Sequence, residues 1–431
     1  MFRYAFNWLF CFIVLSPSWL FADELPFLDP DAKNYRTPLA GEGFHTTVFG
    51  EKVTVSPRER RYIQAWDLGL AAVLSEMENS RYLPFGSVYV WRRPHEQFFL
   101  RGVFVGVYNE LVAAWSRPSW GPLEFVVDFE NFTIPASQSE FIDGTRQNSG
   151  DLHWGWIRPG AGVGYRLNFK NPEKFPLETD NMFEAALLFE PGYYYYGPSD
   201  TTHELFKTPS STYDLRGHAR FKYDNLRRNI MELAHQGVVF GADFFWSHRT
   251  DWRNWGLHSE ESAKDADQYF GLSGYGWLAG RAPFLNADRH RLIASLHGGY
   301  GRRMDRFSVF RVGGGPNGEE YYSAARPILP GAFIQEMLTD RYLVFLAEYR
   351  WEPLFFSYVG MRSSLSYLRR KRSENGKITK SADLLPSVGA RVTTGFFSDT
   401  RLQVDYNYNW GVIRKGAFGG HEMTAHVSKE F

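Results

Sequence analysis

The 431-residue chain is poor in cysteine, in long apolar runs and in excess charge of either sign. Its single cysteine, Cys11, lies in an N-terminal stretch typical of a secretion signal, so we expect no disulfide and no cysteine metal site in the mature chain. After that stretch no apolar run reaches the roughly 18 residues of a membrane-spanning helix. Basic and acidic side chains balance at 48 each, so the composition does not favour binding to nucleic acid.

Aromatic residues are abundant by contrast. They make up 17% of the chain, although the mean hydropathy is only −0.37. This combination fits a transmembrane β-barrel, in which lipid-facing side chains alternate with polar ones. Residues 402–410 show the alternation clearly, with Leu402, Val404, Tyr406, Tyr408 and Trp410 on one face and Gln403, Asp405, Asn407 and Asn409 on the other. A soluble β-sandwich also alternates, but its buried face seldom ends in Tyr or Trp, as these segments do.

About fifteen strand-like segments follow one another from Gly86 to the C-terminus, and bacterial single-chain barrels have even strand numbers. We therefore predict an all-β fold, a transmembrane antiparallel β-barrel of about 16 strands. Near the C-terminus the connections should alternate between long and short, as expected for loops on one side of a membrane and turns on the other. The segments assigned to these connections are 313–340, 352–353, 367–386, 398–400 and 411–420.

The N-terminal part of the chain predicts two segments before the barrel. Residues 1–22 carry a basic Arg3 and a short apolar stretch, which is typical of a signal peptide. Residues 23–85 are expected to form a periplasmic or plug extension, with a helix that begins at the Ser56–Pro57 start signal. Residues 86–431 are then the outer-membrane β-barrel.

The C-terminal end carries a second expectation. Phe431 is an aromatic residue that closes the last strand-like run, and we expect it to be the terminal assembly signal that the barrel-assembly machinery reads during biogenesis. The predicted location is the outer membrane of a Gram-negative bacterium, with outer-membrane lipids and lipopolysaccharide as partners. The basic stretch 369–380 is a candidate contact for lipopolysaccharide phosphates.

Motifs of catalysis and metal binding are weak in this sequence. Gly313, Gly315 and Gly318 match a dinucleotide-binding spacing, but no βαβ pattern surrounds them. His421 and His426 flank Glu422 at a spacing one residue too long for a zinc protease motif, and on a strand they would face opposite sides. We therefore predict no catalytic residues, no metal and no cofactor.

Residues 310–355 resemble the C-terminal region of the bacterial surface antigen superfamily of outer-membrane barrels. That group includes barrel-assembly factors, two-partner-secretion translocators and patatin-fused barrels. The matching features are the Gly313–Gly314 pair after a Phe–x–Val run, a long loop, and an alternating strand that carries Glu348 and Arg350 before a tight turn. The chain looks like a short form of the family, without its periplasmic polypeptide-transport-associated domains.

The resemblance implies that residues 313–340 form a gating loop in the lumen, with Gly313, Gly314 and Arg326 as its key residues. In the family an Arg-Gly-Tyr or Arg-Gly-Phe triplet supplies an arginine that meets polar groups on the barrel wall. Here Pro327 follows Arg326, so the triplet is absent. Arg326 is a candidate substitute and Glu348 its candidate partner, while Glu348 and Arg350 are expected to face the lumen.

The resemblance implies a barrel that inserts or translocates proteins or lipids and that is not an enzyme. Protein cargo is then a candidate partner. A passive porin-like channel is the alternative, and a membrane-embedded hydrolase is a further one, because scattered Ser and His residues are compatible with it.

Overall fold

The computed structural model describes most of the chain after the expected signal peptide. The described residues are 25–58, 62–74, 82–133, 137–169, 182–257, 266–283, 285, 288–315, 324–374, 377–395 and 400–430. The signal peptide expected over residues 1–22 and the proposed assembly signal Phe431 therefore lie outside the described part.

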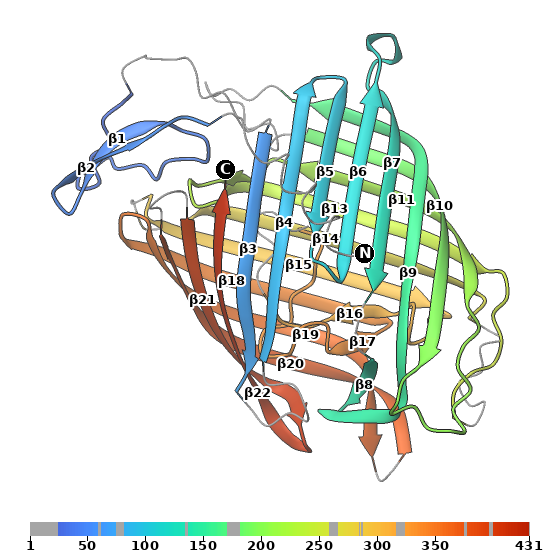
Figure 1. Cartoon of the computed structure of the whole chain (residues 1–431). Helices are drawn as coiled ribbons and strands as arrows, with labels where there is room; N and C mark the ends of the chain where they lie inside the picture. The colour runs from blue at the N-terminus through green and yellow to red at the C-terminus, as the bar shows by residue number, and fades with distance from the viewer. Residues whose placement is uncertain are drawn as a thin grey trace, which may run out of the picture.

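Sixteen antiparallel strands close into a barrel (Figure 1), which confirms the predicted fold class and strand number. The strands of the wall are β3 (Tyr62–Val73), β4 (Tyr82–His95), β5 (Phe98–Phe104), β6 (Tyr108–Ser116), β7 (Leu123–Thr133), β9 (Thr145–Asn168), β10 (Met182–Pro198), β11 (Thr212–Asp224), β13 (Ala234–Arg249), β14 (Gln268–Arg281), β15 (His290–Arg302), β18 (Arg341–Leu354), β19 (Ser357–Glu374), β20 (Lys377–Gly395), β21 (Thr400–Arg414) and β22 (Ala417–Glu430). The barrel closes between its last and first strands, where β22 pairs with β3 from Glu422 opposite Val73 to Glu430 opposite Ala65.

The remaining elements are short. They are β1 (Phe44–Val48) and β2 (Glu51–Val55), which form a hairpin outside the wall, and β8 (Gln138–Ile142), β12 (Arg227–Arg228), β16 (Phe310–Val312), β17 (Met337–Thr339) and the 3₁₀ turn η1 (Pro118–Trp120). Among the described residues, no helix has the length and apolar composition needed to cross a membrane.

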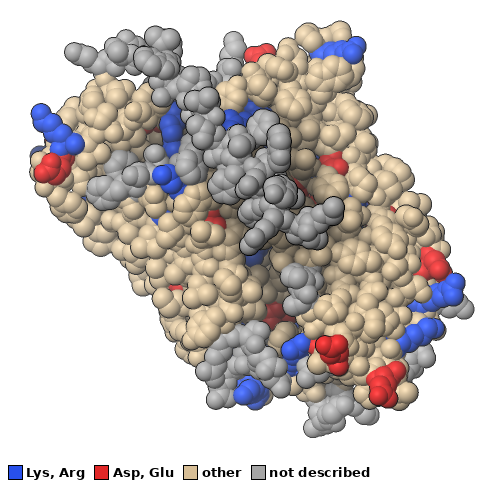
Figure 2. Space-filling model, viewed as in Figure 1, with Lys and Arg blue, Asp and Glu red and all other residues tan. Residues whose placement is uncertain are grey.

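Alternation along each strand sorts the side chains between two environments. On β18, Glu348 and Arg350 are buried inside the barrel, whereas Phe345 and Trp351 are exposed on its outside. Apolar outward side chains recur around the wall, and in Figure 2 most of the wall surface is uncharged while charged side chains gather near its two ends. A wall that is apolar outside and polar inside is the pattern of a membrane barrel.

The two ends of the barrel differ in their connections. We call the end that holds the C-terminus of β22 the turn end; its connections include the tight turns 96–97 and 355–356. The opposite end is the loop end, and its longest connection, residues 303–340, joins β15 to β18. Short turns are periplasmic and long loops extracellular in bacterial barrels.

The helix predicted to begin at Ser56 is wrong. Residues 62–73 instead form β3, the first strand of the wall, and β4 begins at Tyr82, so the wall starts well before the expected boundary at Gly86. The spacing of Ile63, Trp66 and Leu70 in the sequence fits a helical period of 3.6. In the structure Ile63 is buried inside and Leu70 is exposed outside, so the period is 2 and pairing with β22 and β4 overrides the local helix signal.

Two of the predicted long loops are also wrong. Residues 367–386 and 411–420 are the ends of β-hairpins, because β19, β20, β21 and β22 extend well beyond the length needed to cross a membrane. The charged stretch in the first hairpin pairs across to the β8–β9 hairpin, where Lys371 Nζ lies 3.0 Å from Glu140 Oε2. Strand propensity was underestimated there because Lys and Arg are common in solvated loops.

The N-terminal segment 25–58 packs against the turn end of the barrel. Phe44 of β1 is buried with Phe356 and Tyr358 of the β18–β19 region and with Leu233 before β13. The segment is thus attached to the wall by an apolar cluster, although most of the β1–β2 hairpin is exposed (Figure 1).

Candidate functional site

The described residues of the connection between β15 and β18, 303–315 and 324–340, turn back into the barrel; we call them the lumen loop. Its side chains Val312, Leu329 and Met337 are buried against wall residues that face inward. The full cluster is Val312, Leu329, Ala332, Met337, Tyr342, Val344, Leu368, Leu385 and Val412. Because wall residues from β18 to β21 share this cluster with the loop, the loop occupies the lumen beside these strands rather than the space outside the barrel.

Glu422 on the last strand, β22, anchors the loop. Its side chain is buried, and its two carboxylate oxygens accept hydrogen bonds from Gly315 N at 2.6 Å and Gly331 N at 3.0 Å. Asn407 Nδ2 donates a third bond at 3.3 Å. A carboxylate that accepts two backbone N–H bonds satisfies donors that would otherwise be buried without a partner. One side chain therefore joins both arms of the loop to the strand that closes the barrel.

Further contacts hold the loop against several wall strands. Asn409 Nδ2 on β21 donates to Pro330 O at 2.9 Å. Arg414 on the same strand pairs with Glu336, with Nη2 2.7 Å from Oε2, and both side chains are buried. Five strands away from β21 in the wall, Trp277 Nε1 on β14 donates to Ala324 O at 3.0 Å. The loop thus contacts wall strands on both sides of the two strands that it joins.

The Gly313–Gly314 pair lies where no side chain fits. A Cβ atom on Gly313 would overlap Phe333 O, and one on Gly314 would overlap the Glu422 carboxylate. Both glycines are therefore required by the close approach of backbone to backbone and of backbone to carboxylate, not by a left-handed φ. The sequence singled out this pair, and the structure gives its physical reason.

Arg326 lies in the same region of the loop. Its Nη2 donates to Gly314 O at 3.4 Å, and its side chain lines the open part of the lumen. The structure gives Glu348 different partners, which are arginines of the wall itself. Arg326 contacts the glycine pair, and its candidate pairing with Glu348 is replaced by these wall contacts.

Glu348 and Arg350 belong to a buried ionic network that crosses four strands. Arg350 Nη2 lies 2.7 Å from Glu348 Oε1, and Arg362 Nε lies 3.0 Å from Glu348 Oε2. Arg362 and Arg391 also contact Asp405 Oδ1, at 2.8 and 2.6 Å. The network ties β18, β19, β20 and β21 together on the inner face, close to the lumen loop.

The described residues leave another part of the lumen open. A cavity of about 1340 Å³ lies along the inner faces of β3 to β14, and its boundary includes Arg306, Arg326 and Phe333 of the lumen loop. The loop therefore divides the interior into a filled part beside β18 to β22 and an open part beside the first strands.

Sequence reasoning missed the principal anchor. Glu422 was considered only as the centre of a poor zinc motif, and the two histidines do lie on opposite faces, with His421 bonded to Tyr406 Oη and His426 buried beside Asp67. The described residues contain no cluster of His, Cys, Asp and Glu suited to a metal ion. Alternation along the last predicted strand places Glu422 on the inner face of the wall, and this was the one sequence feature that could have drawn attention to it. Its partners, Gly315 and Gly331, can be identified only from the folded loop.

Similarity to known proteins concerns the fold. No protein-family model matches the sequence, and a search of curated proteins gives no match. Among solved structures, BamA from Haemophilus ducreyi lacking POTRA domains 1-3 matches with a TM-score of 0.51 and 10% identity, over 90% of this chain and 75% of that chain. The chain also matches CdiB from Acinetobacter baumannii, with a TM-score of 0.48, 9% identity and coverage of 92% and 66%. For CdiB from Escherichia coli these values are 0.46, 10%, 90% and 67%.

The BamA match, at 10% identity, shows that the two chains share the barrel fold. The chain spans about two thirds of the length of the two CdiB chains.

Proposed function

We propose that this protein is an outer-membrane insertion or translocation barrel, non-enzymatic, in which the lumen loop acts as a gate. The observation that supports the proposal most directly is the anchoring of the loop by Glu422, which lies on one of the two strands that close the barrel. A movement of β22 would therefore change the contacts of the loop, and release of the loop would enlarge the lumen. The family resemblance of residues 310–355 supports the same function.

The gate is testable by single-channel recording of the purified barrel in planar bilayers. Replacing residues 313–340 with a short glycine–serine linker should raise the conductance, because the loop fills the lumen beside β18 to β22. A wild-type conductance that is already large and steady, and that the replacement leaves unchanged, would contradict the gate and favour a passive channel.

A single substitution makes the same test without deleting chain. Gly314→Ala places a Cβ atom on the Glu422 carboxylate, so the loop should detach more often and the current should flicker to higher levels. Gly280→Ala on β14 is the matched control, because a Cβ atom there meets open space. Equal recordings from the two variants would count against the role of Glu422 as the anchor.

A further inference from the structure

The strands that form the barrel wall are short at the β5–β6 hairpin. A strand needs roughly 9–11 residues to cross the hydrocarbon of a bilayer, whereas β5 has 7 residues. β4 continues past the end of the hairpin: it pairs with β5 only from Val88 to His95, and Tyr82–Ser87 pair with β3 and with no other described strand. Among the described residues, no strand therefore pairs with residues 82–87 of β4 on the side of the hairpin tip 104–108, and Figure 1 shows where these strands end; we call this place, at the loop end, the β4 notch.

The cavity in the lumen reaches this notch. Its lining includes Leu83, Pro84 and Gly86 on the β4 side and Val105 and Val107 at the hairpin tip. In Figure 2 the wall is furrowed in this region, with a few charged side chains visible inside the furrow. The notch is thus continuous with the hollow part of the lumen.

The notch meets hydrocarbon on its outer side. Leu68, Val88 and Phe104 flank it with apolar side chains that are exposed on the outer surface, at 59%, 48% and 39%. Outward apolar side chains of a membrane barrel contact acyl chains. An acyl chain is therefore the nearest candidate to enter.

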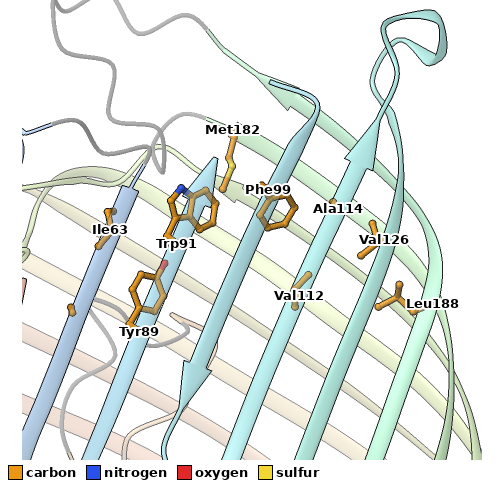
Figure 3. Packing of buried hydrophobic residues seen from close by; sticks show 10 residues of the cluster. Ile63, Tyr89, Trp91, Phe99, Val112, Ala114, Val126, Met182 and Leu188 are labelled. Carbon is orange, nitrogen blue, oxygen red and sulfur yellow. The ribbon is translucent and has the colours of Figure 1, made fainter. Parts of the chain in front are cut away.

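From the edge of the notch toward the turn end, the inner wall is apolar, which is unusual for the interior of a membrane barrel. Buried side chains of β3 to β7 and β10 form one surface there, and Figure 3 shows them side by side; they include Ile63, Trp91, Phe99, Val112, Val126 and Met182. Trp91 Nε1 is buried and has no hydrogen-bond partner among the described residues. Water alone would wet this surface poorly, while an acyl chain would cover it favourably.

Charge does not provide a competing explanation of the cavity. Of the described residues that line it, nine are basic and nine are acidic, and several pair with each other, such as Arg166 with Glu124 at 3.1 Å. The cavity therefore has no excess charge to attract an ion or a nucleic acid. Its distinctive feature is the apolar surface.

We propose that the β4 notch is a lateral portal through which an acyl chain of an outer-leaflet lipid enters the lumen and lies on the apolar surface of β3 to β7 and β10. This site is separate from the β22–β3 closure of the barrel. It goes beyond the proposed gate, because lipid can occupy the cavity whether or not the barrel moves cargo.

Quenching by brominated acyl chains tests the portal. A fluorophore is attached at Val112→Cys, with Cys11 replaced by Ser, and the protein is placed in vesicles of phosphatidylcholine with brominated chains. Val112 faces the cavity and its neighbour Leu111 faces outward, while Ser366 faces the loop-filled part of the lumen. We expect strong quenching from labels at positions 112 and 111 and none at position 366.

A matched pair of cavity variants completes the test. Val126→Trp fills the apolar surface from inside and should abolish quenching at position 112, whereas Val127→Trp, on the outer face of the same strand, should leave it unchanged. Heat-modifiable migration confirms that each barrel is folded. Quenching at position 112 by aqueous iodide but not by brominated lipid would overturn the proposal, since the cavity would then hold water. Displacement of the brominated chains by an extended peptide, and not by unbrominated lipid, would also overturn it.

Discussion

At the scale of single residues, Glu348 has the most consequential position in the wall. Its carboxylate is buried and lies within 3.0 Å of both Arg350 and Arg362, with Arg391 at 3.5 Å. Alternation along β18 was enough to predict that Glu348 and its neighbour Arg350 share the inner face. Arg362 and Arg391 could not be assigned, because their approach depends on the register of β19 and β20 against β18.

Glu348→Gln should destabilise the barrel, because it removes a negative charge that three buried guanidinium groups share. Breaking a buried ion pair costs about 3–5 kcal/mol, and urea unfolding in detergent or lipid measures the change. Asp251→Asn is the control: its pair with Arg253 is largely exposed, and such pairs contribute only about 0–1 kcal/mol. Equal stability of the two variants would contradict the structural role of the network.

At the scale of elements, the N-terminal segment 25–58 depends on a polar contact as well as on the Phe44 cluster. Thr37 N donates to Asp288 Oδ2 at 2.9 Å, at the connection between β14 and β15. Burial alone would raise the pKa of Asp288. Its pKa nevertheless lies well below the ordinary value, because the carboxylate is stabilised by the hydrogen bond and charge of His235, by the charge of Arg291 and by the Thr37 N–H.

Asp288→Ala should loosen the segment, because it leaves the buried Thr37 N–H without its acceptor, at a cost of about 1–3 kcal/mol. Limited proteolysis of the barrel in detergent measures this as faster cleavage within residues 25–58. Asp200→Ala, an exposed position in a connection at the loop end, should have no effect. Cleavage at the wild-type rate in Asp288→Ala would show that the apolar cluster alone fixes the segment.

The pH dependence of the same contact follows from the sign of the shift. A carboxylate whose pKa is lowered on folding stabilises the folded form above its unfolded pKa, and this contribution is lost as the pH falls through the lower folded value. We therefore expect the contribution of Asp288 to leave the rate of proteolysis within residues 25–58 constant between about pH 5 and pH 8.

At the scale of the whole molecule, the exposed apolar band defines the surroundings of the barrel. Leu187 on β10 and Leu205 in the connection 199–211 are almost equally exposed, at 68% and 71%. In water the two leucines would be equivalent. In a membrane they differ, because Leu187 lies on the wall and Leu205 lies beyond the end of its strand.

Leu187→Arg should therefore destabilise the barrel in lipid by up to about 2–4 kcal/mol, the range for arginine on the lipid face near the bilayer midplane. Leu205→Arg should change stability by less than about 0.5 kcal/mol, as usual for a surface position. Urea unfolding in phospholipid vesicles measures both. Equal stability of the two variants would contradict a membrane-embedded wall.

The sequence by itself determined the period of the wall and the approximate number of strands, because alternation between hydrocarbon and water acts on each strand separately. It also marked Gly313–Gly314 and the strand with Glu348. Only the tertiary structure decided that residues 62–73 are a strand, since pairing with both β4 and β22 overrides the local helical signal. The tertiary structure also made Glu422 the anchor of the lumen loop and left β5 shorter than its neighbours in the wall. Both depend on contacts between residues that are far apart in the chain, and the strand register of the closed barrel sets the distances between those residues.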